Sequence, residues 1–262
     1  MENNTYESEY TPEQPTQKKN TKKIWLLIGL GVAVVAIVAV LLFLFVFKGD
    51  KDSDGKSKEK QTANTYETPV KLMEDFANVK DASVFYEKET EKLNGFCEKE
   101  YKEIVEIQKK SDDYDKALGY IDESIEMLKE EYGDNYKVKY EITDEEELAE
   151  EECSDFRDEL RDAGNRMINS LEDMDSDDYK DIAEAWGITK EQAKEIVQVY
   201  QDIAKTLKSA EITAGYELII TQTLTGSELD EPKVTENMKL TVYKINGTWV
   251  SSETLSMLVG SF

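Results

Sequence analysis

Residues 24–47 form the longest apolar stretch of the chain. They contain no charged residue, and only Gly29 and Gly31 fall outside the apolar set. A helix of this length spans roughly 36 Å, whereas the hydrocarbon core of a bilayer is about 30 Å thick. The stretch ends in bulky residues, whereas the apolar region of a cleaved signal peptide is shorter and ends at small residues. The pattern therefore predicts one uncleaved transmembrane helix that serves as a signal anchor.

The segments on either side of this apolar stretch are polar. Residues 1–23 combine two prolines with many Glu, Gln, Asn and Thr residues, a composition typical of a disordered tail. Residues 48–66 are rich in Lys, Asp, Ser and Gly and are interpreted as a polar linker. Four lysines lie within six residues before the stretch and two lie as close after it. This balance favours a cytoplasmic N-terminus, and it predicts a single-pass protein of the cell membrane with residues 67–262 extracellular.

From Thr68 onward the apolar spacing becomes that of a folded domain. Thr68 and Pro69 are typical of a helix start, with the threonine as N-cap. Apolar residues at helical spacing predict three helices, over about residues 70–77, 81–105 and 112–132, the last of which is closed by Gly133. The residues from Tyr136 to Ile142 then alternate strictly, which predicts a strand with one buried face.

A second group of helices is predicted after this strand. Two capping boxes, at 143–146 and 189–192, indicate helix starts, and a short helix over 179–186 is expected to end at Gly187. These helices are treated as a helical insertion covering about residues 144–209.

The C-terminal part of the chain is predicted to be sheet. Residues 211–224 are rich in β-branched side chains, and residues 239–245 alternate between apolar and polar. Asn246-Gly247 is the preferred two-residue hairpin turn before a strand at 248–250. Helices gathered first and antiparallel strands last predict an α+β domain, with one sheet wrapped against a helical layer.

Two stretches of this domain resemble the ends of nuclear transport factor two-like (cystatin-like) domains. They are the opening Thr68-Pro69-Val70 through Phe76 to Lys80-Asp81, and the ending from Leu240 to Trp249. The resemblance implies an extracellular module on a single-pass anchor, as in Gram-positive bacterial surface proteins. It also implies a curved sheet and long helices that form a cone with an interior cavity. The fold class expected is thus α+β, an N-terminal single transmembrane helix followed by helices packed on a curved antiparallel sheet.

The composition removes several classes of function. The chain carries 32 basic and 57 acidic residues, no histidine, and a net charge of −25. Such acidity excludes a nucleic-acid partner, because neutralising phosphates needs a basic patch. The missing histidines exclude Ser-His-Asp and Cys-His mechanisms and histidine-bearing zinc sites. We expect no catalytic, cofactor-binding or metal-binding residue, and we interpret the acidic runs as solvated helix faces.

The two cysteines leave two alternatives open. Cys97 and Cys153 both fall on predicted helices. Outside the cell they can form a disulfide, which would stabilise the domain by about 2–4 kcal/mol. Two buried free thiols fit the sequence equally well, because the sequence does not give the distance between them.

Residues 50–55 match the first half of a calcium-binding loop, with aspartates at alternate positions and a glycine for the turn. The twelfth position of such a loop is a bidentate glutamate, and here it is Gln61. Several lysines within the loop also oppose a divalent cation. A solvated spacer is therefore favoured over a calcium site.

Together these patterns predict a membrane-anchored extracytoplasmic binding or sensing module without catalytic activity or cofactor. Its partners are the lipid bilayer, through residues 24–47, and a small molecule, peptide or envelope protein. One alternative is an envelope interaction or assembly protein that acts through its helical insertion or transmembrane helix. The other is a cavity-type enzyme that uses a buried carboxylate.

Overall fold

The computed structural model describes residues 65–111 and 113–259. The predicted tail, the transmembrane stretch and the calcium-like pattern lie outside these residues. Within the described part, no helix is both long and apolar enough to cross a bilayer.

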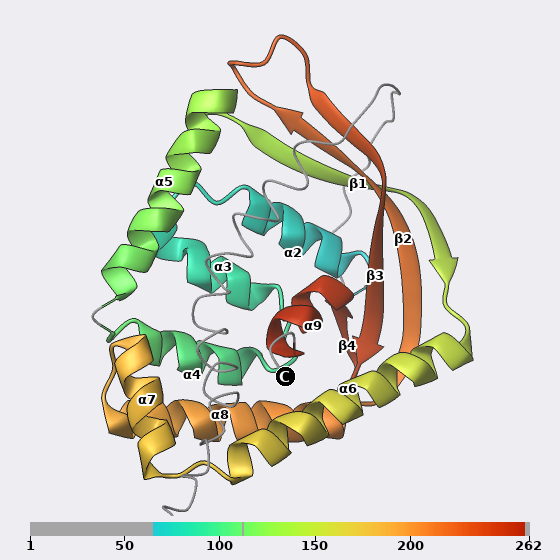
Figure 1. Cartoon of the computed structure of the whole chain (residues 1–262). Helices are drawn as coiled ribbons and strands as arrows, with labels where there is room; N and C mark the ends of the chain where they lie inside the picture. Colours follow the sequence, from blue (N-terminus) through green and yellow to red (C-terminus); the bar gives the residue numbers. More distant parts are fainter. Residues whose placement is uncertain (1–64, 112, 260–262) are drawn as a thin grey trace, which may run out of the picture.

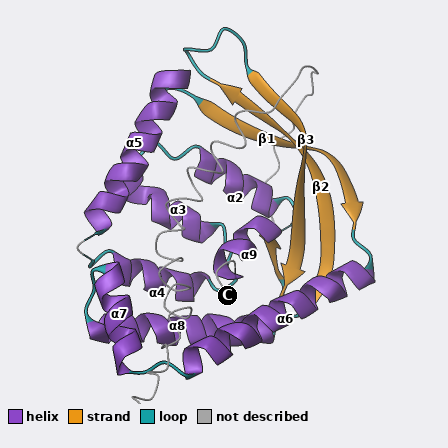
Figure 2. Ribbon diagram, viewed as in Figure 1, coloured by secondary structure: helices purple, strands orange, loops and turns teal. Residues whose placement is uncertain are grey.

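The described chain is an α+β protein in which the helices lie to one side of a single sheet and across one end of it (Figure 1, Figure 2). This confirms the predicted α+β class and antiparallel sheet. The helices are α2 (Thr68–Ala77), the short 3-10 helix η1 (Ala82–Val84), α3 (Phe85–Glu91), α4 (Glu98–Gln108), α5 (Tyr114–Tyr132), α6 (Glu150–Glu172), α7 (Ser176–Trp186), α8 (Lys190–Lys208) and α9 (Ser252–Val259). The strands are β1 (Lys137–Glu147), β2 (Ile212–Thr225), β3 (Lys233–Ile245) and β4 (Thr248–Ser251).

The four strands lie in the order β1-β2-β3-β4, and every neighbouring pair is antiparallel. The register shifts once between β1 and β2 and twice between β2 and β3, and the strands bend along their length (Figure 2). One face of the sheet packs against α2, which inserts Val70 among the sheet residues Leu218, Leu240 and Trp249. Apolar burial on this face positions α2 across the sheet.

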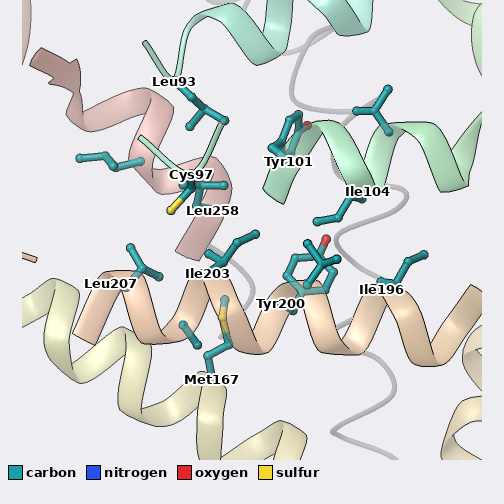
Figure 3. Packing of buried hydrophobic residues seen from close by; sticks show 14 of the residues in the cluster. Leu93, Cys97, Tyr101, Ile104, Met167, Ile196, Tyr200, Ile203, Leu207 and Leu258 are labelled. Carbon is teal, nitrogen blue, oxygen red and sulfur yellow. The ribbon is translucent and has the colours of Figure 1, made fainter. Parts of the chain in front are cut away.

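The larger core is helical and is centred on α8. Figure 3 shows Tyr200 and Ile203 of α8 directed toward α4, and Met167 of α6 approaching α8 from the other side. Ile203 and Met167 have no exposed surface. Because α8 is covered by α4 on one side and α6 on the other, the relative position of these three helices is fixed by packing.

Several local signals from the sequence are confirmed. Thr189 and Gln192 form the predicted capping box, in which each residue's side chain accepts a hydrogen bond from the other's backbone N–H, at 2.8 and 3.2 Å. Gly187 ends α7 in the left-handed conformation, with a φ of 60°. Asn246 and Gly247 adopt φ values of 49° and 87°, as a two-residue hairpin turn requires.

The predicted helix start at residues 143–146 is wrong, because this segment belongs to β1. Residues 144–147 pair with residues 216–219 of β2, so the ladder supplies backbone hydrogen bonds that a capping box cannot match. The helix α6 begins only at Glu150, where the Ala149 N–H donates to Oε2 of Glu152 at 2.8 Å. The helical insertion therefore covers α6 to α8, residues 150–208, rather than 144–209.

Other boundaries of the helices also differ from the prediction. The helix expected over 81–105 is divided into η1, α3 and α4, because Asn94, Gly95 and Cys97 adopt positive φ values in the turn before α4. Thr68 is the first residue of α2 rather than its N-cap, and its hydroxyl accepts the Thr65 N–H at 3.0 Å. The helix α9 was not predicted, and the Ser251 side chain caps its start by accepting the Thr254 N–H at 3.2 Å.

Candidate functional site

A groove of about 880 Å³ runs along the surface between α4 and α8, which lie side by side (Figure 1). Its floor is apolar, since Ile107 and Val199 are each only 6% exposed there. The residues that line it are Gly95, Glu98, Lys99, Lys102, Glu103, Glu106, Ile107, Glu195, Gln198 and Val199. In the sequence these residues occur at helical spacing on two distant segments, so only the packing of α4 against α8 brings them together.

The rim of this groove carries four glutamates and two lysines. Both rim lysines are engaged along α4, Lys102 with Glu98 at 2.6 Å and Lys99 with Glu103 at 3.4 Å. Such exposed pairs one helical turn apart contribute only about 0.3–0.5 kcal/mol each and exchange readily for other partners. Glu106 is paired in the same way with Lys109 at 2.6 Å, so three of the four rim glutamates have a lysine partner that a cationic ligand would replace. The groove is net acidic around an apolar floor, an arrangement suited to a ligand that is cationic and partly apolar.

A second group of polar side chains is buried between α3 and α4. Glu89 and Lys92 are 1% and 7% exposed, and the Tyr101 hydroxyl donates to Oε2 of Glu89 at 3.1 Å. Nζ of Lys92 lies 3.8 Å from the centre of the Phe76 ring and 4.0 Å from Sδ of Met257. Burial raises the pKa of the Glu89 carboxyl, while the neighbouring Lys92 and the Tyr101 hydrogen bond oppose this rise. Burial likewise lowers the pKa of Lys92.

Glu89 is the kind of carboxyl that a cavity-type enzyme would use as a general acid or base. It lines neither the α4–α8 groove nor the small cavity described below. Its surroundings are the packed side chains of the helical core, including Tyr86 and Tyr101. Glu89 was not predicted from the sequence. Its spacing from Phe85 places it on the apolar face of α3, and this spacing could have indicated a buried carboxyl.

Lys80 is a third ionisable group removed from water. Its Nζ is buried without a hydrogen-bond partner and lies over the ring of Tyr136. Burial, together with the smaller effect of the positive charge of Lys129 on α5, lowers the pKa of Lys80 to about 7. Tyr136 also lines a cavity of about 30 Å³ between α2, α3 and α5, which has room for about one or two water molecules. A cavity of this size argues against a substrate site beside Lys80.

The two cysteines are free and buried, which is the second of the alternatives left open by the sequence. Cys97 ends the turn before α4, and Cys153 lies on α6 near Gly215 and Tyr243. Burial raises the pKa of Cys97 to about 12 and also raises the pKa of Cys153. Both thiols are therefore poor nucleophiles.

Comparison with known proteins found no matching family model, no similar curated protein and no similar solved structure. The likeness to nuclear transport factor two-like domains accordingly stays a prediction. Among residues 65–111 and 113–259, no group of three or more His, Cys, Asp or Glu side chains is arranged to hold a metal ion. The candidate site is thus assigned on the geometry of the α4–α8 groove.

Proposed function

We propose that the chain is a membrane-anchored extracytoplasmic binding module without catalytic activity, and that the α4–α8 groove holds a cationic amphipathic peptide. The observation that carries this proposal is the rim of the groove, where four glutamates outnumber two lysines around the apolar floor of Ile107 and Val199. Lysine or arginine side chains of the ligand would meet the rim, and its apolar side chains would cover the floor.

The dimensions of the groove suit a short helix. Its α4 wall extends from Glu98 to Ile107, which at about 1.5 Å per residue is roughly 14 Å. A helical peptide of about twelve residues is roughly 18 Å long and spans this wall from end to end. A helical peptide of this kind binds through apolar residues at helical spacing, and the floor at Ile107 and Val199 would receive them.

The two alternatives have less support. An assembly surface on the helical insertion would show large exposed apolar side chains there. The exposed large hydrophobic residues in the described part are Val84, Tyr120 and Met127, all outside α6 to α8. A cavity-type enzyme would need a ligand beside Glu89, which lines neither of the two cavities described above.

The groove is tested with a fluorescein-labelled twelve-residue peptide that carries leucine and lysine at helical spacing, added to the full chain in lipid nanodiscs. We expect the triple variant Glu103→Gln, Glu106→Gln, Glu195→Gln to bind about tenfold more weakly, because three exposed charge contacts are worth about 0.5 kcal/mol each. Fluorescence anisotropy gives the affinity, and the affinity should fall as salt is added.

The matched control removes three glutamates from the exposed surface of α5, with Glu123→Gln, Glu126→Gln and Glu130→Gln. It changes the net charge by the same amount and leaves the groove intact. If both triple variants weaken binding equally, the peptide senses only the overall charge, and the groove is not the site.

The proposed localisation is tested separately by treating intact cells with protease. We expect the domain at residues 67–262 to be digested from outside while residues 1–23 are protected. Detection uses antibodies to each part. A C-terminal domain that survives shaving of intact cells, yet is digested after lysis, would place it on the cytoplasmic side.

A further inference from the structure

The strand β1 is an edge strand, because it pairs only with β2 in the described part of the chain. The backbone groups of alternate residues in such a strand point away from its partner. The first half of this edge is covered by side chains of α2. Asn78 accepts the Val138 N–H at 2.9 Å and donates to the Val138 carbonyl at 2.7 Å, and Glu74 accepts the Tyr140 N–H at 2.8 Å.

The second half of the β1 edge is open. The same alternation, continued through the register shift after Ile142, directs the backbone groups of Ile142, Glu145 and Glu147 outward. The Glu145 N–H donates to Oδ1 of the neighbouring Asp144 at 2.9 Å. Tyr66 also forms a side-chain hydrogen bond with Glu145. Within residues 65–111 and 113–259, neither of these contacts covers the backbone groups of Ile142 and Glu147, and the residues from Thr143 to Glu147 are exposed.

The charge around this open edge restricts what can pair with it. Residues 141–152 contain eight acidic residues and no basic residue. A second copy of the chain would bring the same carboxylates face to face, and like charges on directly opposed strand residues are destabilising. An uncharged strand would gain only backbone hydrogen bonds. A lysine- or arginine-rich strand would gain those bonds together with ion pairs on both faces.

We propose that the edge of β1 from Ile142 to Glu147 receives an extended, basic segment of a partner protein as an additional strand of the sheet. Main-chain hydrogen bonds to Ile142, Glu147 and the carbonyl of Glu145 supply the binding, because the Glu145 N–H is already held by Asp144. The surrounding carboxylates select the basic partner. Asn78 and Glu74 already bind the outward backbone groups of Val138 and Tyr140, so an added strand can pair only with the second half of β1. This surface is separate from the α4–α8 groove and takes an extended chain rather than a helix.

The test uses the full chain in nanodiscs and the heptapeptide Thr-Lys-Val-Lys-Val-Lys-Thr as probe. One derivative is N-methylated at alternate backbone nitrogens, which blocks one edge of the peptide, and another is methylated at every internal nitrogen, which blocks both. All three carry the same charge. We expect the first derivative to bind like the parent, because it can present its free edge, and the second to bind about tenfold more weakly, since it loses two or three hydrogen bonds.

The site on the protein is tested with the variant Asp144→Asn, Glu145→Gln, Glu146→Gln. We expect it to weaken binding of the heptapeptide about tenfold, whereas the α5 variant Glu123→Gln, Glu126→Gln, Glu130→Gln leaves that binding unchanged. On the wild-type chain, amide exchange at Ile142 and Glu147 should slow when the peptide binds. Equal binding of all three peptides, or unchanged exchange at these amides, would overturn strand addition.

Discussion

Replacing Gly164 with alanine is expected to lower the free energy of unfolding by about 2 kcal/mol, the cost of overpacking a well-packed core. Gly164 is buried on α6 where this helix crosses α8. A Cβ atom there would lie 2.6 Å from the carbonyl oxygen of Ala204 and 2.8 Å from the backbone nitrogen of Lys208. Both contacts are with backbone, so the side chain cannot be relieved by a rotamer change, and the two helices must separate.

The control for this variant is Gly119→Ala, on the exposed part of α5. A Cβ atom at Gly119 meets nothing within 4 Å. Alanine should stabilise this helix by about 0.5–1 kcal/mol, because glycine loses more backbone entropy on folding. Urea unfolding of both variants measures the difference. If Gly164→Ala is also stabilising, then α6 and α8 are not in the close contact described above.

The variant Lys92→Met is expected to destabilise the protein by about 1–3 kcal/mol at pH 7, because it leaves the buried Glu89 carboxyl without its nearby positive charge. Methionine keeps most of the side-chain volume against Phe76. The loss of stability comes instead from Glu89, because the positive charge of Lys92 opposes the rise in the pKa of the Glu89 carboxyl. Without Lys92 the Glu89 carboxyl has to bind a proton or remain charged in the core.

The pH dependence of this variant separates electrostatics from packing. A carboxyl whose pKa is raised on folding binds more protons in the folded state, so its contribution to stability is greatest below the unfolded value of 4.5 and is lost as the pH rises above it. We therefore expect Lys92→Met to lose stability more steeply than wild type as the pH rises above about 4.5. Urea unfolding across this range provides the measurement.

The double variant Glu89→Gln, Lys92→Met supplies the control. It has no ionisable group at either position, so the extra pH dependence should disappear. Its stability should return to within about 1 kcal/mol of wild type, because replacing a buried pair together is often neutral. An equal loss in the single and double variants at every pH would show that Lys92 acts through packing alone.

The features predicted correctly from the sequence are those decided by neighbouring residues. The capping box at Thr189, the stop at Gly187 and the turn at Asn246-Gly247 each need only a few adjacent side chains. The buried face of α8 follows in the same way from its helical spacing. The capping motif at Thr143 failed because β2, more than seventy residues away, pairs with that segment and overrides its local preference.

The prediction of one continuous helix through the break before α4 was wrong for a different reason. Asn94-Gly95 is a recognised turn signal, but it lies between apolar residues whose spacing also fits a continuous helix. The positive φ values of both residues show that the turn signal prevails. The groove could not be predicted, because it exists only where α4 and α8 meet. Neither helix contains a sequence motif that indicates which other helix it packs against.

The contact between Asn78 and Val138 also has a mechanical consequence. The helix α2 is the first described element after the linker, and if residues 24–47 anchor the chain, any pull on the domain enters through α2. Asn78 and Glu74 join α2 to β1 by three hydrogen bonds. A pulling force would therefore be transmitted directly from α2 to the edge strand β1, and α2 would not move independently of the sheet.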